Sequence, residues 1–338
     1  MPEGYTHASI AQKAAAAADW KIHSLEAFLA GANGPDMLFC YQAWKKPARR
    51  KINLPALGNR MHAERTGAFL KALSHHAITP VQRDYFLGFL CHYATDTVVH
   101  PYVEAVTRCC AVYGGRTGHG AFEVALDSHL HEKATGSGAV PLKDMCPRLK
   151  GVELAQVIAQ LRRALYDTYD LEIPGSCLVD AFNHSYRLRS LFASHTPLRL
   201  RQKVCRVLEC FMGGKGYITG HMTPAPLRGI SGKDAKKGIR LPNVWQDPYT
   251  GETREENIYQ LLEKAEMYST LLVREATAFY TGWDLFWPLV GSKDYTWGAE
   301  TTLSTTPAAH LAAVACPEQP TAMVFAEEET AEPAGEMV

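Results

Sequence analysis

Apolar residues recur at the spacing of an α-helix through most of the chain. Leucine and aromatic side chains return about every 3.6 residues, which places them on one face of a helix. No stretch alternates apolar and polar residues for long enough to predict a convincing strand. The pattern predicts an all-α, multi-helix fold, with helices at 6–30, 58–73, 79–103, 119–134, 151–169, 175–193, 197–213 and 255–281.

Several residues mark the ends of these predicted helices. Thr6 is the expected N-cap of the first helix, which puts His7 in its first turn. Thr79-Pro80 opens the third helix, because proline suits the first helical turn. Pro101 is expected to kink or end that helix, since proline lacks the N–H that helical hydrogen bonding needs.

The composition changes near residue 299. From there on the chain has seven Glu and no Asp, Lys or Arg, with few bulky apolar residues. We expect one helical domain over residues 1–298 and an acidic, disordered tail over residues 299–338. The chain before residue 299 has 28 acidic and 35 basic residues. This diffuse surplus of positive charge mildly favours anionic substrates. The dense basic stripe of a stable nucleic-acid-binding protein is missing from the sequence.

The cysteines and the N-terminal sequence indicate a reduced, intracellular protein. Nine cysteines form no CxxC pair, and their odd number argues against a disulfide framework. The first residues lack the basic and apolar pattern of a signal peptide, and no run of about 18 apolar residues predicts a transmembrane segment. The expected location is cytoplasmic.

Two groups of polar residues carry the candidate chemistry. His92, Asp96 and His100 are spaced i, i+4, i+8, so a helix presents them on one broad face. His119 and Glu123 form a second i, i+4 pair. Imidazole nitrogens and carboxylate oxygens one turn apart can reach one zinc-like ion. The alternative is a polar helix with satisfied structural histidines.

Other candidate residues lie around these groups. Asp36 follows Gly34-Pro35, which cannot continue a helix, so we expect it on a loop. Asp127 lies one turn after Glu123 and is either a partner that supports a ligating histidine or a plain surface carboxylate. The next histidines of the same helix, His129 and His131, are expected to face solvent.

The order of the motifs resembles one known family. The segments YTH, GPD, MH, HYATDTVVHP and HGAFE follow one another as in the zinc-dependent phospholipase C family, which is related to the fungal single-strand nucleases. The later NVWQDPYTGE is similar to a less-characterised bacterial branch. The resemblance covers roughly residues 5–285.

The resemblance implies two zinc ions and, in some members, a third. The residues that match the first zinc site are Asp36, His62, His92 and Asp96. Those that match the second are His100, His119 and Glu123. The third takes Asp96, His7 and a free N-terminal residue, but this chain begins with Met-Pro, which departs from the family's processed start. His7 then either binds a weaker third ion or only donates a hydrogen bond to Asp96.

The chemistry follows from the ions. Divalent metals polarise phosphoryl oxygens and lower the pKa of bound water, which predicts hydrolysis of a phosphate ester by a metal-held hydroxide. Asp36 is the candidate to ligate the metal and to orient or deprotonate that water. No GxSxG motif suggests a serine nucleophile.

The substrate stays open at this point. In members that cleave choline lipids, aromatic residues and a carboxylate near the metal-binding loop hold the headgroup. Here Met37 follows Asp36, with Phe39 and Tyr41 nearby. A phospholipid, another phosphodiester as in a nuclease, and a zinc-stabilised helical binding protein without turnover are the alternatives.

Overall fold

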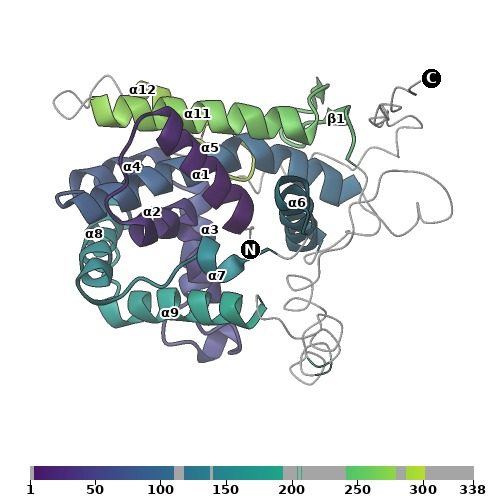
Figure 1. The fold of residues 1–338 in the computed structure, drawn as a ribbon. Coiled ribbons are helices and arrows are strands. Elements are labelled where there is room, and N and C mark those ends of the chain that lie inside the picture. Colours follow the sequence, from purple (N-terminus) through teal and green to yellow (C-terminus); the bar gives the residue numbers. More distant parts are fainter. Residues whose placement is uncertain are drawn as a thin grey trace, which may run out of the picture.

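The computed structural model describes residues 4–109, 118–137, 140–192, 241–278 and 287–300, with Val204 and Val207. The fold is all-α, as the hydrophobic pattern predicts (Figure 1). The elements are α1 (Gly4–Ala17), α2 (Leu25–Ala32), the 3-10 helices η1 (Gly34–Cys40) and η2 (Pro47–Arg49), α3 (Leu54–Ala63), α4 (Thr66–His75), α5 (Pro80–Cys109), α6 (Gly118–Thr135), α7 (Leu142–Met145), α8 (Gly151–Tyr169), α9 (Gly175–Phe192), β1 (Trp245–Gln246), β2 (Thr253–Arg254), α11 (Ile258–Ala278) and α12 (Trp287–Val290). β1 and β2 form one short antiparallel pair, in which Trp245 faces Arg254.

The long helix α5 lies at the centre of the fold. It packs against α2 and α11, while α1 contacts α11 and α5 (Figure 1). Its hydrophobic side is fully buried among these neighbours and includes Tyr85, Phe89 and Tyr93. The Thr79 hydroxyl accepts a hydrogen bond from the Gln82 N–H at 3.3 Å, which satisfies one free N–H of the first turn. α5 also contacts α1, η1 and α6, which lie on its polar side.

Two glycines bring the backbones of α2 and α5 into contact. A Cβ atom on Gly31 would lie 2.1 Å from the Tyr85 carbonyl oxygen, and one on Gly88 would lie 2.1 Å from the Phe28 carbonyl oxygen. No side chain fits at either distance, so glycine is required at both positions. This close approach sets the end of α2, and with it Asp36, beside α5.

The predicted helix 6–30 is two helices, and Thr6 is not its N-cap. α1 begins at Gly4, so Thr6 lies inside it. The chain turns between α1 and α2 because Asp84 of α5 accepts hydrogen bonds from the Trp20 indole N–H and the backbone N–H groups of His23 and Ser24. These tertiary contacts outweigh the helix propensity of the alanine-rich segment.

The predicted helix 58–73 is also two helices. The segment belongs to α3 and α4, which are separated at Arg65 in the left-handed conformation (φ 53°).

Pro101 lies inside α5 and does not end it, so of the two expected effects the kink stays a prediction. Proline there leaves the Thr97 carbonyl without its helical N–H partner. Gly298 packs against that carbonyl, since a Cβ on it would lie 2.3 Å away.

Two predictions lie largely outside the described residues. They are the helix 197–213, of which only Val204 and Val207 are described, and the acidic tail, of which only Ala299 and Glu300 are described. The division into 1–298 and 299–338 stays a prediction.

Candidate metal centre

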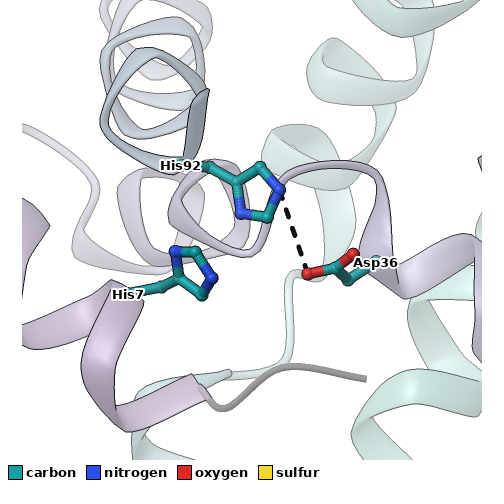
Figure 2. A group of neighbouring side chains, drawn as sticks. All are labelled: His7, Asp36 and His92. Atoms are coloured by element: carbon teal, nitrogen blue, oxygen red, sulfur yellow. Dashed lines mark ion pairs between the residues drawn. The ribbon is translucent and has the colours of Figure 1, made fainter. Parts of the chain in front are cut away.

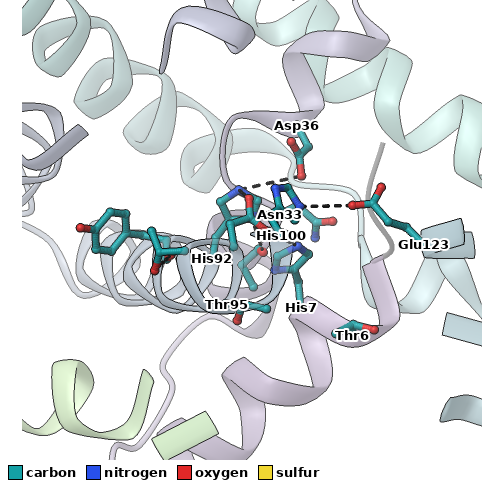
Figure 3. A network of polar contacts seen from close by, with 12 residues as sticks. Thr6, His7, Asn33, Asp36, His92, Thr95, His100 and Glu123 are labelled. Carbon is teal, nitrogen blue, oxygen red and sulfur yellow. Dashed lines mark hydrogen bonds and ion pairs between the residues drawn. The ribbon is translucent and has the colours of Figure 1, made fainter. Parts of the chain in front are cut away.

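All eight predicted ligand residues gather where five elements meet. α5 presents His92, Asp96 and His100 on its polar side, as the i, i+4, i+8 spacing predicts. The others come from α1, η1, α3 and α6, namely His7, Asp36, His62, His119 and Glu123. Seven of the eight are buried, and the His119 side chain is 29% exposed. Figure 3 shows Asp36, His92, His100 and Glu123, which come from three of these elements, pointing toward one another.

The first group contains Asp36, His62, His92 and Asp96. The Nε2 atom of His62 lies 3.2 Å from Asp36 Oδ1, and that of His92 lies 3.0 Å from Asp96 Oδ2. Figure 2 shows His92 facing Asp36, with His92 Nε2 3.9 Å from Asp36 Oδ2. Asp36 lies in the 3-10 helix η1 and not on the expected irregular loop. Gly34 starts η1 with φ 51°, and a Cβ there would lie 2.1 Å from the His92 ring. Glycine therefore lets the Asp36 segment approach His92.

The second group contains His100, His119 and Glu123. Glu123 Oε1 lies 3.2 Å from His100 Nε2 (Figure 3). The same oxygen lies 2.9 Å from His119 Nε2. The Asp96 carboxylate joins this group to the first. Its Oδ2 faces His92, while its Oδ1 lies 3.2 Å from His100 Nε2 and 3.1 Å from His7 Nε2.

A pocket between α1, α5 and α6 reaches this junction. Its polar lining includes His7, Asp96 and Glu123. Val99 and Leu126 contribute apolar walls. Apolar walls around charged groups strengthen electrostatic interactions by excluding water.

Buried polar atoms of the two groups are not satisfied by protein partners. Among the described residues, both carboxylate oxygens of Asp36 and of Asp96 lack a hydrogen bond of acceptable geometry, as do His92 Nε2 and Glu123 Oε2. Buried polar groups are normally hydrogen-bonded, so such a cluster needs a further partner. Three sets of ligand atoms each lie within 4.8 Å of one another: His7, Asp36 and His92; His62, His92 and Asp96; His100, His119 and Glu123. This donor set of imidazoles and carboxylates fits zinc.

The electrostatics keep the carboxylates ionised. Burial alone would raise the pKa of Asp96, but His100, His92 and His7 hold that pKa well below its usual range. Burial likewise opposes ionisation of Asp36, while His92 and His62 lower its pKa overall. Burial lowers the pKa of His92 despite both carboxylates. Ionised carboxylates and a neutral imidazole are the forms that bind a cation.

Backbone carbonyls orient two of the imidazole rings. His62 Nδ1 lies 2.7 Å from the Gly58 carbonyl oxygen, and His92 Nδ1 lies 3.3 Å from the Ala32 carbonyl oxygen. A carbonyl oxygen only accepts, so each Nδ1 carries the hydrogen. In the neutral rings, the Nε2 lone pair then points toward the carboxylates, which is how histidines are prepared for a metal.

Asp127 is buried and supports the turn that carries His7. Its carboxylate accepts hydrogen bonds from the backbone N–H groups of Tyr5 and Thr6 and from the Thr6 hydroxyl. It therefore contacts the backbone next to His7 and is not a plain surface carboxylate. Burial raises the pKa of Asp127 to about 6, although these donors favour the ionised form.

The neighbouring histidines behave differently from each other. The His131 side chain is buried and its Nδ1 contacts the Ser137 carbonyl, so the prediction that it faces solvent is wrong. His129 bonds the Tyr259 hydroxyl at 2.7 Å in an exposed position. Ser137, which follows α6, contacts the His131 ring, and helical spacing does not reveal this contact.

Two residues near the centre are absent from the sequence predictions. Glu104 Oε1 lies 2.9 Å from His119 Nδ1. Tyr295 packs its ring against His62 and His92, with centroid distances of 5.1 and 5.7 Å, and its N–H donates to the His62 carbonyl. Glu104 continues the i+4 series of α5 and could have been found from that spacing. Tyr295 lies more than 190 positions from either histidine, and no motif in the sequence around it indicates a contact with them.

The comparison with protein families agrees with this geometry. A family model described as zinc dependent phospholipase C matches residues 6–169 of the 338-residue chain. Residues 6–169 belong to the zinc-dependent phospholipase C family. This zinc-dependent phospholipase C region includes all eight candidate ligands, Glu104 and Asp127. No curated protein and no solved structure matches the chain.

No helix in the described part of the chain combines the length and the apolar character that crossing a bilayer requires. The cytoplasmic location expected from the sequence stays a prediction.

Proposed function

We propose that the chain is a zinc-dependent phosphoric ester hydrolase of the phospholipase C type. The observation that carries the proposal is the convergence of eight imidazole and carboxylate side chains, several of whose buried oxygens and nitrogens lack a hydrogen bond of acceptable geometry. The family match supports zinc as the metal. A phospholipid or another phosphodiester is the substrate class.

The ligand sets follow the two groups. One ion would be held by Asp36, His62, His92 and Asp96. A second would be held by His100, His119 and Glu123. His7 Nε2 lies close to Asp96 Oδ1. Either these two residues hold a third, more weakly bound ion, or they form only a hydrogen bond with each other.

Asp36 is the proposed catalytic residue. Bound zinc polarises phosphoryl oxygens and lowers the pKa of a coordinated water. Asp36 Oδ1 lies near His62, whereas Oδ2 is 3.9 Å from the nearest imidazole nitrogen of His92 and is freer to accept a proton. In our proposal this oxygen orients the attacking water toward phosphorus and takes up its proton.

The test is the variant Asp36→Asn, assayed beside the zinc-loaded wild type. The amide keeps an oxygen for the metal but cannot take a proton, so we expect hydrolysis to fall by about 100-fold or more with zinc retained. Probes are bis(p-nitrophenyl) phosphate, phosphatidylcholine vesicles and single-stranded DNA. Asp167→Asn is the matched control, because Asp167 contacts His76 at 2.7 Å on the surface.

The outcomes separate the alternatives. Hydrolysis of vesicles supports a phospholipase, and preferential hydrolysis of DNA supports a nuclease-like phosphodiesterase. If the wild type binds zinc and hydrolyses none of the probes, the zinc-stabilised binding protein is favoured. If Asp36→Asn retains zinc and full activity, Asp36 does not have the proposed role.

A further inference from the structure

Glu104 and Glu123 hold His119 from opposite sides. Glu104 lies on α5, one turn beyond His100, and its Oε1 is 2.9 Å from His119 Nδ1. The other ring nitrogen, Nε2, is 2.9 Å from Glu123 Oε1 on α6. The imidazole therefore lies between carboxylates of two different helices.

This arrangement determines which nitrogen carries the hydrogen when a cation is bound. An ionised carboxylate only accepts, so without a cation Glu104 and Glu123 each favour a hydrogen on the ring nitrogen that they face. A cation held by Nε2 and Glu123 leaves the hydrogen of the neutral ring on Nδ1, where Glu104 accepts it. The Gly58 and Ala32 carbonyls act in the same way on His62 and His92 in the first group. In the second group a charged side chain takes the place of the carbonyl.

The second group has a particular need for such a contact. His119 is the second residue of α6, and its side chain is 29% exposed, whereas that of His100 is 10% exposed. Among the described residues, His100 Nδ1 has no hydrogen-bond partner. Thus Glu104 provides an outer contact to a ligand of this group, at the least buried of its rings.

We propose that Glu104 is a positioning residue for the second metal ion, acting through His119. The inference rests on the proposed zinc centre. Carboxylates behind a ligating histidine fix its orientation and raise its basicity, and their loss weakens metal binding by about 10–100-fold. Glu104 is therefore required for full occupancy of the second site, while the first site is independent of it.

The experiment measures zinc dissociation constants by chelator competition for wild type, Glu104→Leu and Glu104→Gln. We expect one zinc equivalent of Glu104→Leu to weaken by about 10–100-fold and the other to be unchanged. Glu104→Gln keeps an acceptor without the charge, so it should fall between the two. Asp167→Asn removes the surface carboxylate beside His76 and should bind zinc like the wild type.

A second readout does not depend on folding of the variants. Long-range proton–nitrogen NMR of the zinc-loaded wild type should show His119 with its hydrogen on Nδ1. Hydrogen on Nε2, or wild-type affinity for every zinc ion in Glu104→Leu, would overturn the inference. Failure of the wild type to bind a second zinc would instead refute the proposed centre, so the two failures are distinguishable.

Discussion

At the scale of single residues, Asp96 is the group on which the centre depends most. Its two oxygens face different partners: Oδ2 faces His92, and Oδ1 faces His100 and His7. It is 1% exposed and its carboxylate is kept ionised by the surrounding imidazoles. One side chain therefore connects both metal groups, whereas His7 approaches three members of the first group, Asp96, Asp36 and His92.

Replacement of Asp96 should consequently have a larger effect than replacement of His7. We expect Asp96→Ala to lose at least one zinc equivalent more than His7→Ala, because the first group loses an anionic ligand and His100 of the second group loses the carboxylate beside it. Elemental analysis after gel filtration measures the difference, and circular dichroism checks that both variants are folded. Equal zinc contents in the two variants would show that Asp96 does not bridge the groups.

The candidate ligands were accessible to sequence reasoning because they follow helical spacing. The pairs on α5 and α6 are i, i+4, and the helical geometry alone brings their side chains to one face. The resemblance to the family alone assigns His7 and His62 as ligands. Asp36 is marked by its place after Gly34-Pro35, but only that resemblance joins it to His92. Tyr295 was missed because its contact with His62 exists only in the folded chain.

At the scale of elements, the site depends on the close contact of α2 and α5. The sequence predicted helices at both places, and it predicted α8 with its observed bounds, Gly151–Tyr169. It did not predict the break before α2, because the acceptor that forms the turn, Asp84, lies 60 positions away from Ser24. Helix types follow from periodicity, whereas their ends follow from tertiary contacts.

A substitution that separates α2 from α5 should lower stability. In Gly31→Ala the new Cβ would lie 2.1 Å from the Tyr85 carbonyl oxygen, and backbone must move to admit it. We expect a loss of about 1–3 kcal/mol in the free energy of unfolding, measured by urea denaturation. The control is Gly175→Ala, whose Cβ would meet only side-chain atoms at 3.5 Å. Equal stability of the two variants would contradict the close packing described here.

At the scale of the whole molecule, the centre joins elements that are distant in the chain. Buried Asp36 and Asp96 repel each other, which raises the pKa of Asp36 against the effect of the histidines. A cation between them removes that repulsion, so metal binding and folding are coupled. The all-α class was predicted from periodicity, but this coupling depends on how the helices are assembled.

Removal of the metal should therefore destabilise the fold. A ligand present at about 1,000 times its dissociation constant stabilises the folded state by about 4 kcal/mol. We expect a chelator to lower the Tm by several degrees, and added zinc to restore it, in thermal unfolding followed by circular dichroism. A Tm that is the same with zinc and with chelator would mean that the cluster is stable without a cation.

The central claim is that the converging side chains bind a cluster of zinc ions. Elemental analysis of the purified full chain, after zinc supplementation and removal of loosely bound metal, tests it most directly. The account predicts two zinc ions per chain, or three if His7 and Asp96 hold another. One ion or none would contradict the account and leave the buried histidines and carboxylates as a purely structural network.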